Sequence, residues 1–178
     1  MASELVGQAQ VALREVPTPA LVIIQTIDND IQCDGHDAQE IHDFGVAVSA
    51  ALKTIAEASP QSRILIVGQP GRPLVEDIAA EAERDPQFKQ ETTGPGECTF
   101  FSPDGEINQA NIAALVHRIE GFEAEQARAC AAISECATDK GVSATLSEIP
   151  DDRILGHLNV HGHARLSALF WPVVAELI

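Results

Sequence analysis

The sequence predicts an α/β fold of three layers, with helices on both faces of a mostly parallel sheet. Two runs of consecutive apolar residues, 20–26 and 63–68, are rich in β-branched side chains, which favours strands buried on both faces. A helical pattern separates the two runs, and a strand–helix–strand unit implies parallel strands joined by a right-handed crossover. In such sheets, binding sites form at the carboxyl ends of the strands.

The expected helices follow from apolar residues at helical spacing and from residues that stop a helix. Pro17 and Pro19 end the first helix, and Ser59 with Pro60 ends the second. Asn108 is a favourable N-cap for the fourth. These signals predict helices at 3–15, 38–58, 74–84 and 108–128, a third strand at 141–146, and a loop at 91–106. Because the chain has no internal repeat and no linker, residues 1–178 are expected to form one domain.

The composition disfavours several classes of partner. Of 178 residues, 11 are Lys or Arg and 27 are Asp or Glu, which gives a formal net charge of −16. A nucleic-acid backbone and an anionic membrane surface both repel such a chain. No apolar stretch is long enough for a membrane span, and the first residues lack the basic start and apolar core of a signal peptide. The acidity indicates a well-solvated surface.

A polar turn that leads into an apolar helix stands out near the C-terminus, at 155–172. Several of its first side chains can take part in acid–base or hydrogen-bond chemistry. They are His157, Asn159, His161 and His163. A helix entered through such a turn commonly holds an imidazole at the rim of a site. The polar loops after the two predicted strands lie at or near the same sheet edge, so a site is expected there without reference to any family.

The same segment carries a resemblance to a known family. His157-Leu-Asn-Val-His-Gly-His-Ala164, followed by a helix ending in Trp171-Pro172, resembles the last sequence block of the SGNH (GDSL-type) hydrolases. The resemblance extends from about residue 21 to residue 178. It implies a flavodoxin-like architecture and hydrolysis of carboxylic esters, including acetyl esters, by a Ser-His-Asp triad that needs no cofactor. The substrate class that it implies is a small ester or an acylated carbohydrate.

Asn29 is the first candidate site residue. It follows the predicted strand in Ile27-Asp-Asn-Asp30, which is similar to the Gly-x-Asn-Asp block of the family, with Ile27 in the usual glycine position. In the family this Asn donates to the oxyanion, an interaction worth about 3 kcal/mol. The structural alternative is an Asx turn that closes the strand.

His157 is the candidate catalytic base, which the resemblance pairs with an Asp three residues earlier. That position holds Ile154 in this chain, so Asp152, five residues before His157, is the candidate partner that orients and stabilises the imidazole; without it, His157 would act alone or with a carbonyl. The alternative is a structural histidine.

The nucleophile is missing. No Gly-Asp-Ser block occurs, no serine follows a buried strand, and Gly141-Val-Ser-Ala-Thr145 is not a nucleophile elbow. The family strand that carries this serine is absent too, which leaves the strand at 20–26 with an unpaired edge. Either the chain is the C-terminal part of a longer protein, or a partner chain completes the sheet edge, or the domain is an inactive relative. Ester hydrolysis is the leading expectation, and a non-catalytic SGNH-like binding or accessory domain is the alternative.

Four cysteines form an even set with three full pairings, and free buried thiols in a cytosolic protein are the structural alternative. The similar hydrolases are often secreted and cross-linked by disulfides. On that resemblance we expect the pairs Cys130–Cys136 and Cys33–Cys98, and a location outside the cytoplasm. Cys33 as a nucleophile is disfavoured, because the acidic residues around it raise the pKa of its thiol.

The sequence contains two candidate metal sites. His157, His161 and His163 with Asp152 could gather a transition metal, although Gly162 interrupts the helical spacing. The stretch from Asp30 to Ile41 has a calcium-loop glycine but lacks the acidic residues that the loop needs at its third and twelfth positions. Neither metal is expected.

Overall fold

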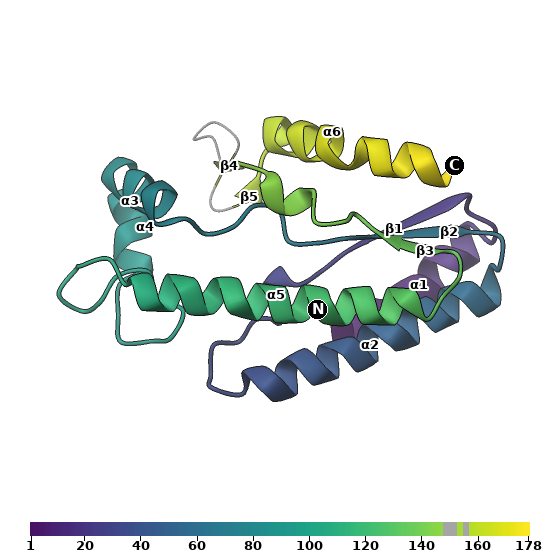
Figure 1. The fold of residues 1–178 in the computed structure, drawn as a ribbon, viewed down its shortest axis with the longest axis horizontal. Coiled ribbons are helices and arrows are strands. Elements are labelled where there is room, and N and C mark those ends of the chain that lie inside the picture. Colours follow the sequence, from purple (N-terminus) through teal and green to yellow (C-terminus); the bar gives the residue numbers. More distant parts are fainter. Residues whose placement is uncertain (148–152, 155–156) are drawn as a thin grey trace.

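A computed structural model of the protein has a three-stranded parallel sheet at its centre (Figure 1). The structure describes residues 1–147, 153–154 and 157–178, and at positions 28, 153, 154 and 157 it describes the backbone alone. The strands are β1 (Leu21–Gln25), β2 (Arg63–Val67) and β3 (Cys136–Thr138), in the order β1-β2-β3. Within the described residues β1 has a strand partner on one side only, which confirms the unpaired edge expected at 20–26.

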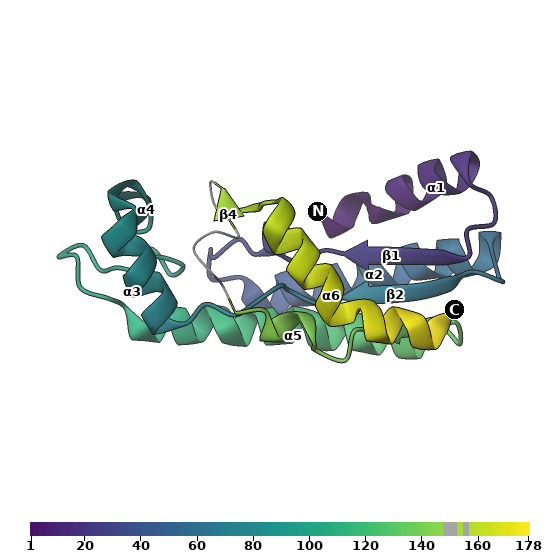
Figure 2. The same ribbon diagram turned by 90° about the horizontal axis from the view of Figure 1, so that it is seen from above.

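Helices cover both faces of this sheet, which confirms the predicted α/β layering. In Figures 1 and 2, α2 and α5 run along one face with α1 beside α2, while α6 crosses the other face. The helices are α1 (Leu5–Glu15), α2 (Asp37–Ala58), α3 (Val75–Arg84), α4 (Pro86–Glu91), α5 (Gln109–Ala131) and α6 (Val160–Leu177), with short 3-10 helices η1 (Ala2–Glu4), η2 (Asp28–Asp30) and η3 (Ser143–Thr145). None of the described helices combines the length and apolar character that crossing a bilayer requires. Assignment to the SGNH type rests on the sequence resemblance alone.

The central strand β2 is buried on both faces. Residues 64–67 are each at most 1% exposed. Ile64 and Ile66 belong to the apolar cluster that α2 and α5 build on one face. Leu65 and Val67 belong to the cluster that α6 builds on the other. Because burying one such side chain stabilises a fold by about 1.5–3 kcal/mol, this strand anchors both helical layers.

Helices α2 and α5 pack closely against each other in the layer that they form on one face of the sheet. The rings of Phe44 and Phe122 meet edge to face with their centroids 4.8 Å apart. Gly121 lets the helices approach, because a Cβ there would lie 2.7 Å from Cδ1 of Ile41. A larger residue at 121 would therefore displace the end of the Ile41 side chain from this close-packed contact.

The third strand lies earlier in the chain than the sequence predicts. Residues 141–146, expected as a strand, form a turn and η3, whereas β3 pairs with β2 at Cys136–Thr138. The Asp139 carboxylate accepts hydrogen bonds from the N–H groups of Gly141 and Ser143, both at 3.0 Å. Gly141 also has a φ of +77°, so the backbone cannot stay extended there. The sequence also missed α4, which Asp85 caps and Pro86 begins.

Helix α6 begins at Val160, earlier than the sequence pattern predicts, since that pattern is helical only after Gly162, and the helix also continues further. The Asn159 side chain caps it by accepting from the N–H groups of His161 and Gly162, at 2.8 and 3.1 Å. The helix does not end at Trp171-Pro172 and runs through Pro172 to Leu177. Asn159 is therefore a helix cap, which explains its place in the polar turn.

Both disulfides expected from the resemblance are present, as Cys33–Cys98 and Cys130–Cys136. The first joins the loop before α2 to the loop before α5 across a sequence separation of 65, and the second joins α5 to β3 across 6. No cysteine is free, so the free-thiol alternative is wrong and Cys33 is not a nucleophile.

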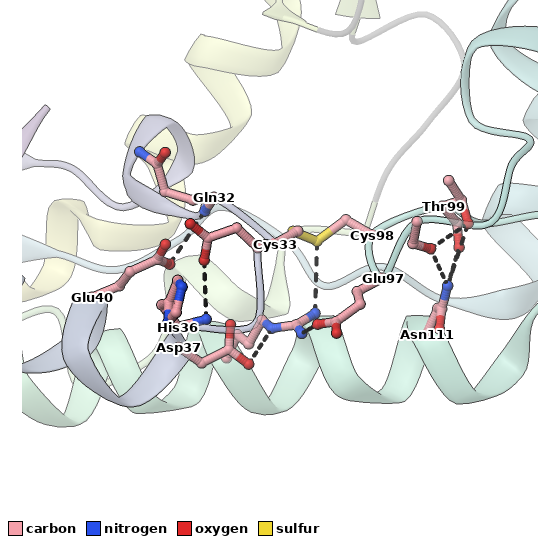
Figure 3. A network of polar contacts seen from close by, with 12 residues as sticks. Gln32, Cys33, His36, Asp37, Glu40, Glu97, Cys98, Thr99 and Asn111 are labelled. Atoms are coloured by element: carbon pink, nitrogen blue, oxygen red, sulfur yellow. Dashed lines mark hydrogen bonds and ion pairs between the residues drawn. A yellow bond between two sulfur atoms is a disulfide. The ribbon is translucent and has the colours of Figure 1, made fainter.

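A buried arginine supports the first of these disulfides (Figure 3). Arg118 of α5, whose side chain is 8% exposed, donates from Nε to Asp37 and from Nη2 to Glu97, at 2.6 and 2.5 Å. Its Nη1 lies 3.7 Å from Sγ of Cys98. Burial acts to lower the pKa of Arg118, but the two carboxylates raise it above its ordinary value. The guanidinium therefore stays charged and ties both cysteine loops to α5.

Glu40 lies among other acids at the start of α2, also in Figure 3. Burial raises its pKa, and the charges of Asp34 and Asp37 add to that rise, against one hydrogen bond from the Gln32 N–H. A carboxylate whose pKa is higher in the folded state opposes folding when it is ionised.

We predict that Arg118→Ala lowers the free energy of unfolding by about 3 kcal/mol, because it leaves Asp37 and Glu97 without their buried cation. Urea denaturation measures the loss. Arg128→Ala is the matched control on α5, since Arg128 makes an exposed pair with Glu125 worth less than about 1 kcal/mol. Similar losses in the two variants would contradict the role given to Arg118.

We predict that Glu40→Gln raises the thermal midpoint at neutral pH. Because the pKa of Glu40 is higher in the folded protein, protonated Glu40 stabilises the fold, and this stabilisation is lost as pH rises through the raised pKa. Below the ordinary value of 4.5, Glu40 is protonated in both the folded and the unfolded protein, so the gain in thermal midpoint from Glu40→Gln disappears there. Glu125→Gln should do the opposite, because the hydrogen bond from Arg128 lowers the pKa of Glu125. Thermal melts at neutral and acidic pH compare the two, and a gain of equal size at both pH values for Glu40→Gln would refute the assignment.

Candidate functional site

The turn that follows β1 has a strained backbone. Ile27 is 1% exposed and has a φ of +142°, a region that favours glycine and that a β-branched residue rarely enters. This is the position at which the resemblance places a glycine. A conformation of this kind costs about 1–3 kcal/mol and persists only where the surroundings enforce it. The turn directs the next residues, η2, away from the strand.

Hydrogen bonds around Asp30 enforce the turn. The Asp30 N–H donates to the carbonyl of Ile27 at 2.6 Å. Its carboxylate accepts from the Thr26 hydroxyl at 2.9 Å and from the N–H of Ala2 at 2.7 Å. Gln126 of α5 donates to the carbonyl of Thr26 at 3.3 Å. Asp30 therefore acts as a structural clamp that fixes the turn.

Sequence reasoning missed this clamp. Ala2 and Gln126 are far from Asp30 in the sequence, so only the fold brings them close to it. Thr26 is near Asp30 in the sequence but belongs to no motif. The one available signal was the polar Asp-Asn-Asp run directly after a buried strand.

A pocket of about 220 Å³ opens beside this turn, at the carboxyl ends of β1 and β2. Its polar lining is rich in amide side chains, which offer both donors and acceptors. The lining residues are Met1, Leu5, Gln8, Gln25, Thr26, Ile27, Asn29, Asp30 and Gln69. Asn29 is exposed at the pocket. The sheet edge at which the sequence predicts a site therefore contains a polar pocket.

The loop after β2 is held in place beside the pocket. Glu123 of α5 accepts from the Gln69 N–H at 3.0 Å and from Nη2 of Arg72 at 2.5 Å. A Cβ at position 68 would lie 2.6 Å from Oε1 of Glu123, so glycine makes room for this carboxylate. Glu123 of α5, which pairs with Arg72, therefore holds Gln69 in its position in the pocket wall.

His157 begins the short strand β5 (His157–Leu158), which pairs antiparallel with β4 (Arg153–Ile154). In this register, Ile154 is directly opposite His157. Position 154, where the resemblance places the Asp of the triad, is thus the cross-strand neighbour of the candidate base. Asp152 and the side chain of His157 lie outside the described part of the chain, so their arrangement with Asn29 stays a prediction.

The histidines of α6 do not form a metal site with other described residues. His161 and His163 are both exposed on the first turn of the helix. Among residues with described side chains, no group of three His, Cys, Asp or Glu is arranged to hold a metal ion.

None of the nine serines of the chain lines the pocket. Ser143 is fully buried. Ser59 and Ser62, just before β2, form a hydrogen bond with each other, and the Ser62 hydroxyl also donates to the carbonyl of Pro19. No serine of this chain is therefore in position to attack a ligand beside Asn29.

A scan against protein-family models and searches of curated proteins and of solved structures found no match to this chain. The site is accordingly interpreted from its own geometry and from the resemblance of its motifs.

We predict that glycine is tolerated better than alanine at position 27. Both variants lose the buried side chain, but only Ile27→Gly also relieves the unfavourable φ, so it should be the more stable of the two by about 1 kcal/mol. At Ile24, which has no positive φ, alanine should be the more stable replacement. Denaturant unfolding of the four variants tests this inversion, and the same order at both positions would contradict strain at Ile27.

Proposed function

We propose that the pocket beside β1 binds carboxylic esters, with acylated carbohydrates as the substrate class, and that it is part of an SGNH-type hydrolase site. The observation that supports this most is Asn29, exposed at a polar pocket directly after a strained turn at the carboxyl end of β1, a strand in which only Ile24 is buried although the sequence predicts burial on both faces. Its amide can donate to an ester carbonyl, and the neighbouring Gln side chains suit carbohydrate hydroxyls.

In this proposal the serine comes from a second polypeptide segment. Its Oγ adds to the ester carbonyl carbon while His157 takes the hydroxyl proton, with Asp152 orienting the imidazole. Asn29 stabilises the oxyanion. The tetrahedral adduct releases the alcohol, which takes the proton from His157, and water then hydrolyses the acyl-serine with His157 as base.

A non-catalytic binding domain is the second candidate. Two observations favour it: no serine lines the pocket, and an isoleucine stands opposite His157 where a carboxylate belongs. Both candidates give the isolated chain the same behaviour, namely ester binding without turnover. They differ in whether a partner that supplies a serine restores hydrolysis.

A location outside the reducing cytosol belongs to the same proposal. Its support is the pair of disulfides, which persist mainly in oxidising compartments.

We predict that the purified chain binds an acetylated oligosaccharide more tightly than its deacetylated form and hydrolyses neither. Asn29→Ala should weaken binding of the acetylated ligand by about tenfold, as expected for loss of one well-placed hydrogen bond. Calorimetry measures affinity, and a chromogenic acetyl ester measures turnover. Gln90→Ala, an exposed amide on α4 outside the pocket, is the matched control.

Equal affinity for the two oligosaccharides, or no loss in Asn29→Ala, would refute ester recognition at the pocket. A fluorophosphonate probe tests the nucleophile separately. Labelling of any serine in the isolated chain, abolished by His157→Ala, would show that this chain holds its own nucleophile and would overturn the need for a second segment.

A further inference from the structure

The two disulfides of the chain lie in different surroundings. Cys130 is 3% exposed and belongs to the apolar cluster that α2 and α5 build, and Cys136 packs against the same cluster. Cys33 and Cys98 are each half-buried, in loops whose neighbouring residues are mostly exposed. A thiol in solution can therefore reach the Cys33–Cys98 bond, whereas a thiolate freed at Cys130 would lie among apolar side chains that disfavour its charge.

The accessible disulfide has two unlike sulfurs (Figure 3). Nη1 of Arg118 lies 3.7 Å from Sγ of Cys98. Cys33, in contrast, is followed directly by the exposed acid Asp34. In thiol–disulfide exchange, the sulfur whose thiolate is better stabilised leaves more readily. The Arg118 cation therefore makes Cys98 the leaving sulfur and Cys33 the sulfur that an incoming thiolate attacks.

Each nitrogen of the Arg118 guanidinium has a different partner. Nε donates to Asp37 and Nη2 to Glu97, which leaves Nη1 at Cys98. Because the Arg118 side chain is only 8% exposed, water screens its interaction with the sulfur little. The two ion pairs involve no sulfur, so they remain when the disulfide opens and keep both cysteine loops against α5. The two sulfurs consequently stay close enough for the bond between them to form again.

We propose that Cys33–Cys98 is a reversible thiol-exchange site whose co-reactant is a small cationic thiol. The thiolate of the co-reactant attacks Sγ of Cys33 and forms a new S–S bond. The old S–S bond breaks, and its electron pair leaves on Sγ of Cys98 as a thiolate. One disulfide replaces another, so the step needs no further oxidant or reductant. Attack of the Cys98 thiolate on Sγ of Cys33 reverses the step and releases the co-reactant.

The acidic side chains of the two cysteine loops select the charge of this thiol. Glu97 is 56% exposed and faces the Cys33 loop, since a Cβ at Gly35 would lie 3.9 Å from its Oε1. Around one guanidinium the loops gather three carboxylates, those of Asp34, Asp37 and Glu97. A thiol that carries an ammonium group is therefore attracted to the site, and one that carries a carboxylate is repelled.

This inference goes beyond the proposed function, because exchange at the disulfide needs neither an ester nor the pocket. It gives Cys33 the part of an electrophile, which is consistent with the absence of a free thiol at that position. Thiol exchange reports on the disulfide, and ester titrations of the Asn29 variants report on the pocket. Failure of one proposal therefore leaves the other standing.

Cysteamine, a small cationic thiol, tests the site in the oxidised chain at about pH 8, where a useful fraction of a thiol is ionised. After a brief reaction, N-ethylmaleimide caps the free thiols, and peptide mapping by mass spectrometry locates each adduct. We expect cysteamine on Cys33, the maleimide on Cys98, and an intact Cys130–Cys136 bond, which is the internal control. Removal of cysteamine before capping should restore the Cys33–Cys98 bond without an added oxidant.

Two mapping results would overturn the inference. One is cysteamine divided equally between Cys33 and Cys98. The other is opening of Cys130–Cys136 at the same rate as Cys33–Cys98.

Salt tests the selection by charge. Raising NaCl from about 10 mM to about 1 M shortens the range of charge interactions from about 30 Å to about 3 Å. The rate with cysteamine should fall about threefold or more, and the rate with 3-mercaptopropionate, an anionic thiol, should rise. The neutral thiol 2-mercaptoethanol is the control and should change little. A change of the same sign for both charged thiols would refute selection of a cationic thiol.

Variants of Arg118 test its role at the leaving sulfur. Arg118→Lys keeps the charge and should keep the preference for Cys33, whereas Arg118→Gln should increase the share of cysteamine found on Cys98. If Arg118→Gln does not fold, Glu97→Gln takes its place. The guanidinium then has one carboxylate fewer, so the freed Cys98 should react with maleimide at lower pH than in the parent chain. An unchanged adduct ratio in Arg118→Gln, or an unchanged pH dependence in Glu97→Gln, would mean that Arg118 only holds the loops together and would overturn its role in exchange.

Discussion

Burial of β2 on both faces is the constraint on which the rest of the structure depends. It is the one described strand of the parallel sheet with two strand neighbours, and its alternate side chains belong to the two separate apolar clusters. Because both helical layers dock on it, it fixes the carboxyl edge of the sheet where the turn at Ile27 and the loop at Gln69 meet. The pocket therefore depends on the pairing register of the strands as well as on the residues that line it.

The parts that the sequence predicted best are those where local pattern and tertiary environment agree. β1 and β2 are apolar runs flanked by helix signals, and both occur within one or two residues of the expected bounds. β3 was out of reach because a three-residue strand has no periodicity, and its place follows from pairing with β2 and from the Cys130–Cys136 link. The run at 141–146 looked extended, but the Asp139 carboxylate binds its N–H groups and turns it.

The candidate site was predictable in outline only. A polar run after a buried strand indicated Asn29, and the structure places that residue at a pocket. The strain at Ile27 could not be foreseen, because isoleucine favours an extended backbone and the contacts that enforce a different one include hydrogen bonds from η1 and α5, which are distant in the sequence. The clamp on Asp30 joins residues up to 100 positions apart in sequence, a distance at which local patterns carry no information.

The unpaired edge of β1 has a consequence for amide hydrogen exchange, because alternate residues of a parallel strand turn their main-chain groups to opposite sides. Val22 and Ile24 have their N–H groups turned toward β2, whereas Leu21, Ile23 and Gln25 have theirs turned to the open side. A single strand should thus contain two interleaved sets of amides, one protected until the sheet opens and one exchanging freely in the folded state. Loss of that alternation in a cell-derived sample would reveal that the edge is occupied, without any need to know by what.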